Sequence, residues 1–128
     1  MGEHIDIEVH RLYDDRHGKT GFRVLVDRLW PRGVRKDDLA FDEWDKDAAP
    51  SNELRKRFHS GALSFAEFRE AYRAELEESG AGEALLQRFR NSRKHSLVLL
   101  YGAKDETHNH ARVLAEHLQE QEQSHGRQ

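Results

Sequence analysis

The chain passes from an apolar strand into a charged loop at Val24-Leu25-Val26-Asp27-Arg28-Leu29-Trp30-Pro31-Arg32-Gly33. Three consecutive aliphatic residues are typical of a strand that is buried on both faces of a sheet. A carboxylate, two guanidinium groups, an indole and a rigid proline then follow where the strand leaves the sheet. Open α/β sheets bind their ligands just beyond such strand ends. The stretch therefore predicts an interior strand with a binding site at its carboxyl end.

Three further segments have the pattern of strands. Residues 5–13 alternate apolar and polar side chains, residues 96–101 contain a continuous apolar run, and residues 41–46 could form a short third strand. The connection between the strands expected at 5–13 and 22–29 is too short for a standard crossover helix. This favours a hairpin between the two, with a parallel arrangement left open.

Helices are expected in four places. Ser51 is a good N-cap, and Ser64 with Glu67 has the pattern of a capping box. Apolar residues at helical spacing continue the second helix to the glycines at 80 and 82, and mark further helices at 85–89 and 109–118. From residue 119 the chain is polar and is expected to fray. The prediction is a single α/β domain over residues 1–118, a small, mostly parallel or mixed sheet with helices packed on its faces, and a tail over 119–128.

Composition excludes several classes of function. The 128 residues contain 35% charged and 36% hydrophobic residues, a net charge of −3 and no cysteine. Thiol nucleophiles, disulfides and zinc–thiolate sites are therefore excluded. The net charge gives no global attraction to nucleic acid or to an anionic membrane, and no segment has the length and apolarity of a membrane span. The expected location is the cytoplasm.

Charged residues follow three of the expected strands, and parallel strands with right-handed crossovers bring such exits to one edge of the sheet. Arginine and lysine there, beside helix N-termini, are suited to a phosphate or carboxylate, and an aromatic face is suited to a base. We therefore predict a pocket for a small anionic ligand, of phosphate or nucleotide type. The predicted ligand-binding residues are Arg28, Trp30, Arg32, Lys46, Ser51, Arg55, Tyr101, Lys104 and Asn109.

Two functions of different class fit this pocket. In the first, the protein is an enzyme on a phosphorylated or nucleotide substrate, with Asp27 or Asp105 as a general base or as a ligand of Mg²⁺. In the second, it is a non-catalytic ligand sensor or protein-interaction module that uses the same basic pocket. The enzyme needs a carboxylate left free within the basic cluster, whereas the sensor predicts that both carboxylates are tied up by arginines. The ligand, the cofactor and the oligomeric state stay open.

Some of these residues also have structural explanations. Trp30 alone is more typical of packing than of a stacking platform, and Ser51 is expected to cap a helix. The run His108-Asn109-His110 has neither the spacing of a metal site nor the context of a nuclease motif. Histidines at a helix start explain it better, and we predict no metal site from it.

The chain resembles the YeaO-like proteins, the domain of unknown function family numbered 488. The resemblance rests on blocks that span nearly the whole chain in order, at residues 27–34, 42–46, 49–55, 99–105 and 109–111. Two positions depart from the family pattern, Arg57, where an aromatic is frequent, and Gly102, where alanine is common. The resemblance implies a small cytosolic α/β protein of bacterial type and adds no particular reaction.

Overall fold

A single parallel sheet organises the molecule. The computed structural model describes residues 5–14 and 20–126. The strands have the order β1-β4-β2-β3, and every neighbouring pair is parallel. This confirms the predicted α/β class, although the strands are shorter than expected at three of the four places. The strands are β1 (Asp6–Arg11), β2 (Phe22–Leu25), β3 (Glu43–Trp44) and β4 (Ser96–Tyr101).

The hairpin favoured for the first two strands was wrong. β4 lies between β1 and β2 and pairs in parallel with both. The ten residues 12–21 join the two strands. Ten extended residues reach about 33 Å, whereas a six-residue strand is about 20 Å long. A connection of ten residues is therefore long enough to span the length of β4.

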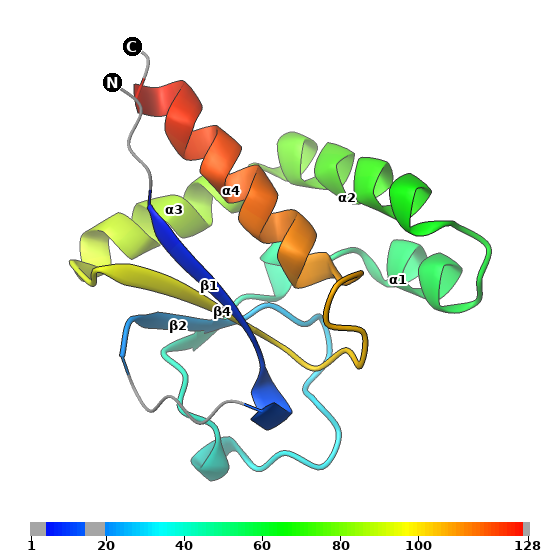
Figure 1. The fold of residues 1–128 in the computed structure, drawn as a ribbon, viewed down its shortest axis with the longest axis horizontal. Helices are drawn as coiled ribbons and strands as arrows, with labels where there is room; N and C mark the ends of the chain where they lie inside the picture. The colour runs from blue at the N-terminus through cyan, green and yellow to red at the C-terminus, as the bar shows by residue number, and fades with distance from the viewer. Residues whose placement is uncertain (1–4, 15–19, 127–128) are drawn as a thin grey trace.

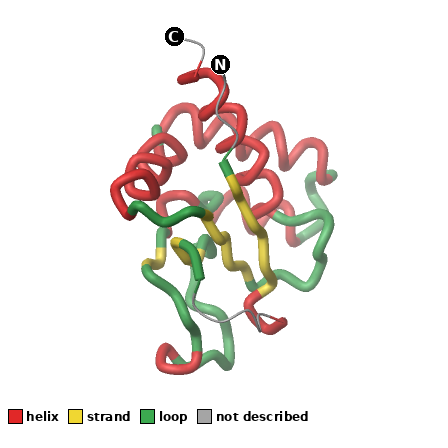
Figure 2. The backbone as a smooth tube through the Cα atoms, turned by 60° about the vertical axis from the view of Figure 1, so that its left-hand side comes forward, coloured by secondary structure: helices red, strands yellow, loops and turns green. Residues whose placement is uncertain are grey.

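The two faces of β4 are covered in different ways. Leu97, Leu99 and Tyr101 belong to the larger core, which the helices cover. Val98 and Leu100 point to the opposite face, where they pack with residues of the segment that joins β2 to β3 and its flanks. This alternation is the period of two of a strand. β4 and β2 are thus buried on both faces, as the aliphatic runs predicted, and in Figure 2 most helical segments lie on one side of the strands.

The helices begin where the capping signals predicted. Ser51 caps α1 (Asn52–His59), and Ser64 with Glu67 forms the capping box of α2 (Phe65–Ser79). Gly80 ends α2 with a φ of 72°, a conformation that glycine adopts readily. α3 (Ala81–Ser92) starts at the next residue, so it is longer than the helix expected at 85–89.

The last helix extends past the expected boundary. α4 (His110–Gly126) continues through residues 119–126, where composition predicted a frayed tail. Gln119 Nε2 donates to the carbonyl of Ile5 at 2.6 Å, and the buried Glu122 pairs with Arg90 of α3 at 2.8 Å. These tertiary contacts hold a polar segment in the helix, and a local composition signal does not contain them.

The sheet brings two chain exits together. Figure 1 shows β2 and β4 running toward the same side of the molecule, where α1 and the start of α4 lie. Val26 N–H donates to the carbonyl of Leu100 at 3.0 Å, so the pairing of β2 and β4 persists up to the point where the chain leaves the sheet. The residues that follow these two strands are therefore neighbours.

Candidate functional site

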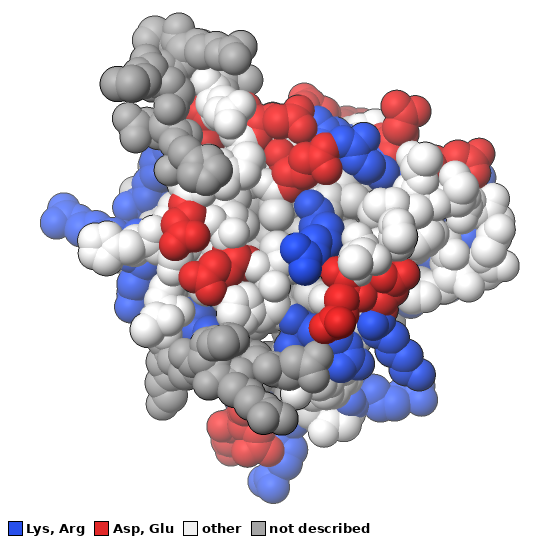
Figure 3. Space-filling view, in the orientation of Figure 1, with Lys and Arg blue, Asp and Glu red and all other residues white. Residues whose placement is uncertain are grey.

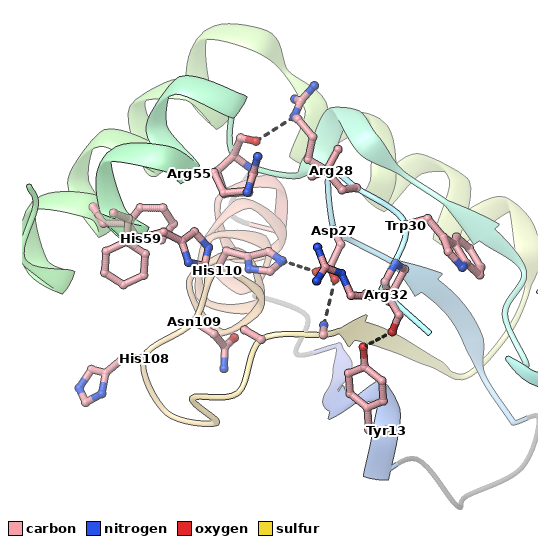
Figure 4. Close-up of a pocket in the computed structure, with 17 residues that line it drawn as sticks. Tyr13, Asp27, Arg28, Trp30, Arg32, Arg55, His59, His108, Asn109 and His110 are labelled. Atoms are coloured by element: carbon pink, nitrogen blue, oxygen red, sulfur yellow. Dashed lines mark hydrogen bonds and ion pairs between the residues drawn. The ribbon is translucent and has the colours of Figure 1, made fainter. Parts of the chain in front are cut away.

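A cavity of about 360 Å³ opens at the carboxyl ends of β2 and β4 (Figure 4). Its floor and one side come from residues 27–32, after β2, and from residues 102–103 and 108–110, after β4 and at the start of α4. The opposite side comes from Pro50, α1 and the first turn of α2, and Tyr13 reaches it from the end of β1. This is the edge of the sheet at which the sequence predicted a pocket.

Asp27 joins three parts of the fold at the floor of the cavity. One carboxylate oxygen, Oδ2, accepts from the Gly102 N–H at 3.0 Å, and the other, Oδ1, lies 2.9 Å from Nε2 of His110. The Asp27 carbonyl accepts from Trp44 Nε1 at 2.7 Å. The end of β2 is thereby tied to β3, to the end of β4 and to the start of α4.

The contact between Asp27 and His110 is close but poorly aligned. Both side chains are 15% exposed, and neither Oδ1 nor Nε2 has a hydrogen-bond partner of good geometry, although the two atoms are within ion-pair distance. Buried polar atoms are normally paired. The two groups therefore lie at ion-pair distance without an aligned hydrogen bond between them.

Three arginines line the cavity, and they differ in how they are held. Arg28 Nε donates to the carbonyl of Pro50 at 2.9 Å, and Figure 4 shows its guanidinium directed away from Asp27 and His110. Arg55 Nε is buried without a hydrogen-bond partner. Arg32 is exposed, and its carbonyl accepts from the Tyr13 hydroxyl at 3.0 Å. Arg55 also donates from Nη2 to Asn52 Oδ1 at 3.5 Å. The exposed guanidinium of Arg32 and the buried Nε of Arg55 are thus the cationic groups most available to a ligand.

Aromatic and apolar side chains form the remainder of the wall. The rings of Phe58 and Phe68 stack with centroids 4.3 Å apart and an interplanar angle of 17°. Pro31 and Pro50 are buried beside the cavity. Two large hydrophobic side chains that border the cavity are exposed, Tyr13 at 48% and Leu29 at 54%. The cavity thus combines a charged floor with an apolar wall.

The structure brings together six of the eleven predicted site residues. Asp27, Arg28, Arg32 and Arg55 line the cavity as described. Trp30 borders it, but its indole packs against Phe41 and Trp44 on the other face of the sheet, as the packing interpretation predicted. Asn109 uses its side chain to cap α4, because Oδ1 accepts from Arg112 N–H and Nδ2 donates to the carbonyl of Asp105.

The two predicted lysines do not line the cavity. Lys46 lies over the ring of Trp44, with Nζ 4.2 Å from its centroid, and Lys104 is exposed on the loop after β4. Two of the three predicted strand exits, those after β2 and β4, therefore converge, whereas the charged exit after β3 does not line the cavity. The convergence brings Arg28 and Arg32 to the cavity and leaves both lysines outside. A cation close to a strand end in sequence can point to either side of the exit loop.

Three other predicted residues have structural roles outside the cavity. Ser51 caps α1 and donates from Oγ to Glu75 of α2 at 2.6 Å. Tyr101 is 1% exposed in the core, and burial raises the pKa of its hydroxyl. Asp105 is exposed. Its carboxylate accepts from the backbone N–H groups of His108 and Thr107, and these hydrogen bonds lower its pKa.

Sequence reasoning missed the cavity's histidines and its aromatic wall. His110 looked like an ordinary helix-start residue, because its contact with Asp27 spans 83 positions in the chain. From the sequence, Phe58 and Phe68 were expected to pack in the core. Phe68 is indeed a buried core residue. The run of histidines before α4 was the available signal for His110. His108 itself points away from Asp27 in Figure 4, with its ring against the edge of Phe65.

Metal ligands do not cluster in the described part of the chain. Residues 5–14 and 20–126 contain no group of three or more His, Asp or Glu side chains placed to hold a metal ion. Asp27 and Asp105, the two ligands considered for Mg²⁺, do not meet, since only Asp27 lines the cavity.

The fold and the cavity define a small α/β protein with a pocket at the carboxyl edge of a parallel sheet. A protein-family comparison matches residues 6–128 to DUF488-N3i, described as the inactive DUF488-N3 subclade. The chain belongs to this family. This confirms the resemblance that the sequence blocks indicated.

Individual relatives agree with this assignment. The uncharacterized protein YeaO of Escherichia coli K12 is 50% identical over 117 residues, which cover 89% of this chain and 97% of that protein. The uncharacterized protein Rv3073c of Mycobacterium tuberculosis H37Rv is 41% identical over 113 residues, which cover 88% and 92% of the two chains. No solved structure matches the chain.

Two further observations concern the helices and the surface charge of the molecule. Within the described residues, every helix is too short or too polar to cross a membrane. On the face drawn in Figure 3, acidic and basic side chains are interspersed. Neither sign of charge dominates that face.

Proposed function

We propose that this protein binds a small anionic ligand in the cavity at the ends of β2 and β4 and does not itself transform it. The engaged state of Asp27 carries the proposal. Its Oδ2 accepts from Gly102, and its Oδ1 lies against His110, so the carboxylate joins three chain segments. Asp105, the other candidate base, is exposed and holds the turn before α4. Both carboxylates are thus held, as a sensor requires, but by backbone N–H groups and a histidine instead of the arginines that the sensor hypothesis predicted.

The chemistry of the cavity wall supports binding without turnover. Among the described residues that line it there is no serine, threonine, lysine or second carboxylate, and the chain has no cysteine. Catalysis through a Ser, Thr, Lys or Cys nucleophile, and paired-carboxylate chemistry, need such groups. The description of the family as an inactive subclade points in the same direction. Ligand binding, with its output through another molecule, is the function that these observations support best.

One observation favours a catalytic alternative. A carboxylate that contacts an imidazole is the arrangement that orients a histidine for general-base catalysis. His110 beside Asp27 could activate a water molecule against a ligand held by Arg55. This alternative predicts a product, whereas the proposed function predicts a ligand that is recovered unchanged.

The test is a thermal-shift screen against phosphate, sulfate, small carboxylates and nucleotides. A ligand at a hundred times its dissociation constant stabilises the fold by about 2.7 kcal/mol, a shift on the order of 10 °C for a domain of this size. We expect the shift to disappear in Arg55→Gln, because the cavity loses an available cation. Arg57→Gln is the matched control, since Arg57 is exposed on the same helix and does not line the cavity.

The outcomes separate the hypotheses. An anion that stabilises the wild type and Arg57→Gln, but not Arg55→Gln, supports the proposed pocket. Equal stabilisation of both variants, or no stabilisation by any anion, contradicts it. Chromatography of the bound ligand after long incubation with the protein then distinguishes binding from turnover, because a new product would support the catalytic alternative.

A further inference from the structure

The geometry of the cavity points to one chemical class of ligand, and we infer that it binds an aromatic monocarboxylate, a single negative charge carried on one aromatic ring. The inference rests on the proposed function, because it names the ligand of the same cavity. Three features carry it: the stacked phenylalanines, the spacing between Arg55 and Phe58, and the balance of charge.

The aromatic wall is suited to a flat ring. Phe58 and Phe68 are stacked nearly parallel, and Phe58 is only partly buried, so the pair presents ring surface at the cavity. Pro50 adds a rigid apolar surface beside them. Aromatic rings gain from offset-stacked or edge-to-face contact beyond the burial of their area. An aliphatic group of the same size would gain the burial but not this additional contact.

A cation lies one helical turn from the aromatic wall. Arg55 and Phe58 are three residues apart on α1, which places them on one face of the helix with about 5–6 Å between their Cβ atoms. Arg55 Nε is buried and has no hydrogen-bond partner. A carboxylate attached to a ring can accept from this guanidinium while the ring contacts Phe58. Arginine is suited to this role because it binds carboxylates through two parallel hydrogen bonds.

The charge of the cavity matches one negative charge. Arg32 and Arg55 are available to a ligand, whereas Arg28 donates to Pro50 and turns its guanidinium away. Asp27 contributes a negative charge at the floor. Leaving out Arg28, which lines the cavity but is turned away, two available guanidiniums stand against the one carboxylate of Asp27. A phosphate dianion would bring a second negative charge close to Asp27, which like-charge repulsion disfavours.

The size of the cavity sets an upper limit on the ligand. An apolar cavity of about 150 Å³ holds benzene, and a water molecule takes a share of about 30 Å³ in the liquid. The volume of about 360 Å³ therefore has room for one ring, a carboxylate and a few water molecules. This fits a substituted benzoate.

The experiment measures binding of a matched series to the full chain by calorimetry, with every probe at pH 8. The probes are benzoate, cyclohexanecarboxylate, acetate, phenyl phosphate and benzyl alcohol. Benzoate is expected to bind tightest, roughly two- to tenfold tighter than cyclohexanecarboxylate, which has the charge and size but no aromatic ring. Benzyl alcohol, which lacks the charge, is expected to bind at least tenfold more weakly than benzoate.

Variants locate the binding. Arg55→Gln and Phe58→Leu are expected to weaken benzoate at least tenfold and at least twofold, respectively. Arg57→Gln and Phe22→Leu are the matched controls and are expected to bind as the wild type does, since neither residue lines the cavity. If Phe58→Leu does not fold, the probe series on the wild type with Arg55→Gln still decides the question.

The outcomes distinguish this inference from the proposed function. Phenyl phosphate, inorganic phosphate or acetate binding at least as tightly as benzoate, with loss in Arg55→Gln, overturns the aromatic monocarboxylate and leaves the anion pocket standing. Equal binding of benzoate and cyclohexanecarboxylate also overturns the aromatic part. Failure of every anion in both this series and the thermal-shift screen overturns the proposed function and this inference together.

Discussion

Two carboxylates follow buried strands in this chain, and the fold uses them differently. Asp27 comes after β2 and contacts residues of β4's exit and of α4 that are 75 and 83 positions away. Asp105 comes after β4, and its carboxylate accepts from the N–H groups of Thr107 and His108, two and three positions away. Asp27 is 15% exposed and lines the cavity, whereas Asp105 is 57% exposed and does not. A charged residue at the end of a strand is therefore not sufficient evidence that the residue belongs to a binding site.

The difference between Asp27 and Asp105 shows which contacts position the residues of the cavity. Long-range contacts hold Asp27 in one position, so the cavity floor is built before any ligand arrives. The contacts of Asp105 only shape a turn. The largest expected effect of a substitution should accordingly come from Asp27.

Asp27→Ala is expected to lower the free energy of unfolding by about 2–3 kcal/mol, because it leaves the Gly102 N–H and the His110 imidazole without their partner. Urea unfolding followed by the fluorescence of Trp30 and Trp44 measures this. Asp47→Ala, an exposed residue near β3, is a control that should change little. If Asp27→Ala proves as mild as this control, the comparison between the two strand exits fails.

Two histidines on α4 extend the comparison to pH. His110 faces the cavity, whereas His117 is 2% exposed and packs against Gly82 of α3. Burial lowers the pKa of His117 below the ordinary 6.5, despite the nearby charges of Glu77, Glu83 and Glu120, and Arg73 lowers it further. The unfolded chain then binds more protons than the folded one. The contribution of His117 to stability is therefore complete above pH 6.5 and is lost as the pH falls through the range below it.

His117→Gln is expected to flatten this loss of stability between pH 7 and pH 5, a smaller effect than that of Asp27→Ala. The measurement is urea unfolding at several pH values in that interval. His95→Gln is the matched control, because His95 is exposed. An equally steep pH dependence in wild type and His117→Gln would show that another group is responsible.

Asp105→Ala is expected to have the smallest effect, a slight loss of stability at pH 7 and no loss of ligand affinity. The N–H groups of His108 and Thr107 lower the pKa of Asp105 below 3.8. Its contribution is therefore present above pH 3.8 and disappears as the pH falls through the lower folded value. Unfolding at pH 7 and near pH 3, with calorimetry of any ligand found, tests this. A loss of affinity comparable to that of Arg55→Gln would instead show that Asp105 contributes to ligand binding.

The location of the site could be predicted from the sequence, but part of its composition could not. Arg28 and Arg32 follow β2 directly, so strand-end reasoning found them. Lys46 lies outside the cavity, because its side chain is held over the ring of Trp44 on another surface. His110 was missed because its meaning depends on a partner that is distant in the chain.

The sequence by itself determined the local elements. The aliphatic runs at 24–26 and 97–100 required strands buried on both faces, and Ser51 and Ser64 determined where helices begin. Only the tertiary structure decided that β4 lies between β1 and β2, which of the charged strand exits form the cavity, and that residues 119–126 stay helical. The physical reason is that periodicity and capping act over a few neighbouring residues. Strand order and the contacts that depend on it join residues that are separated by most of the chain.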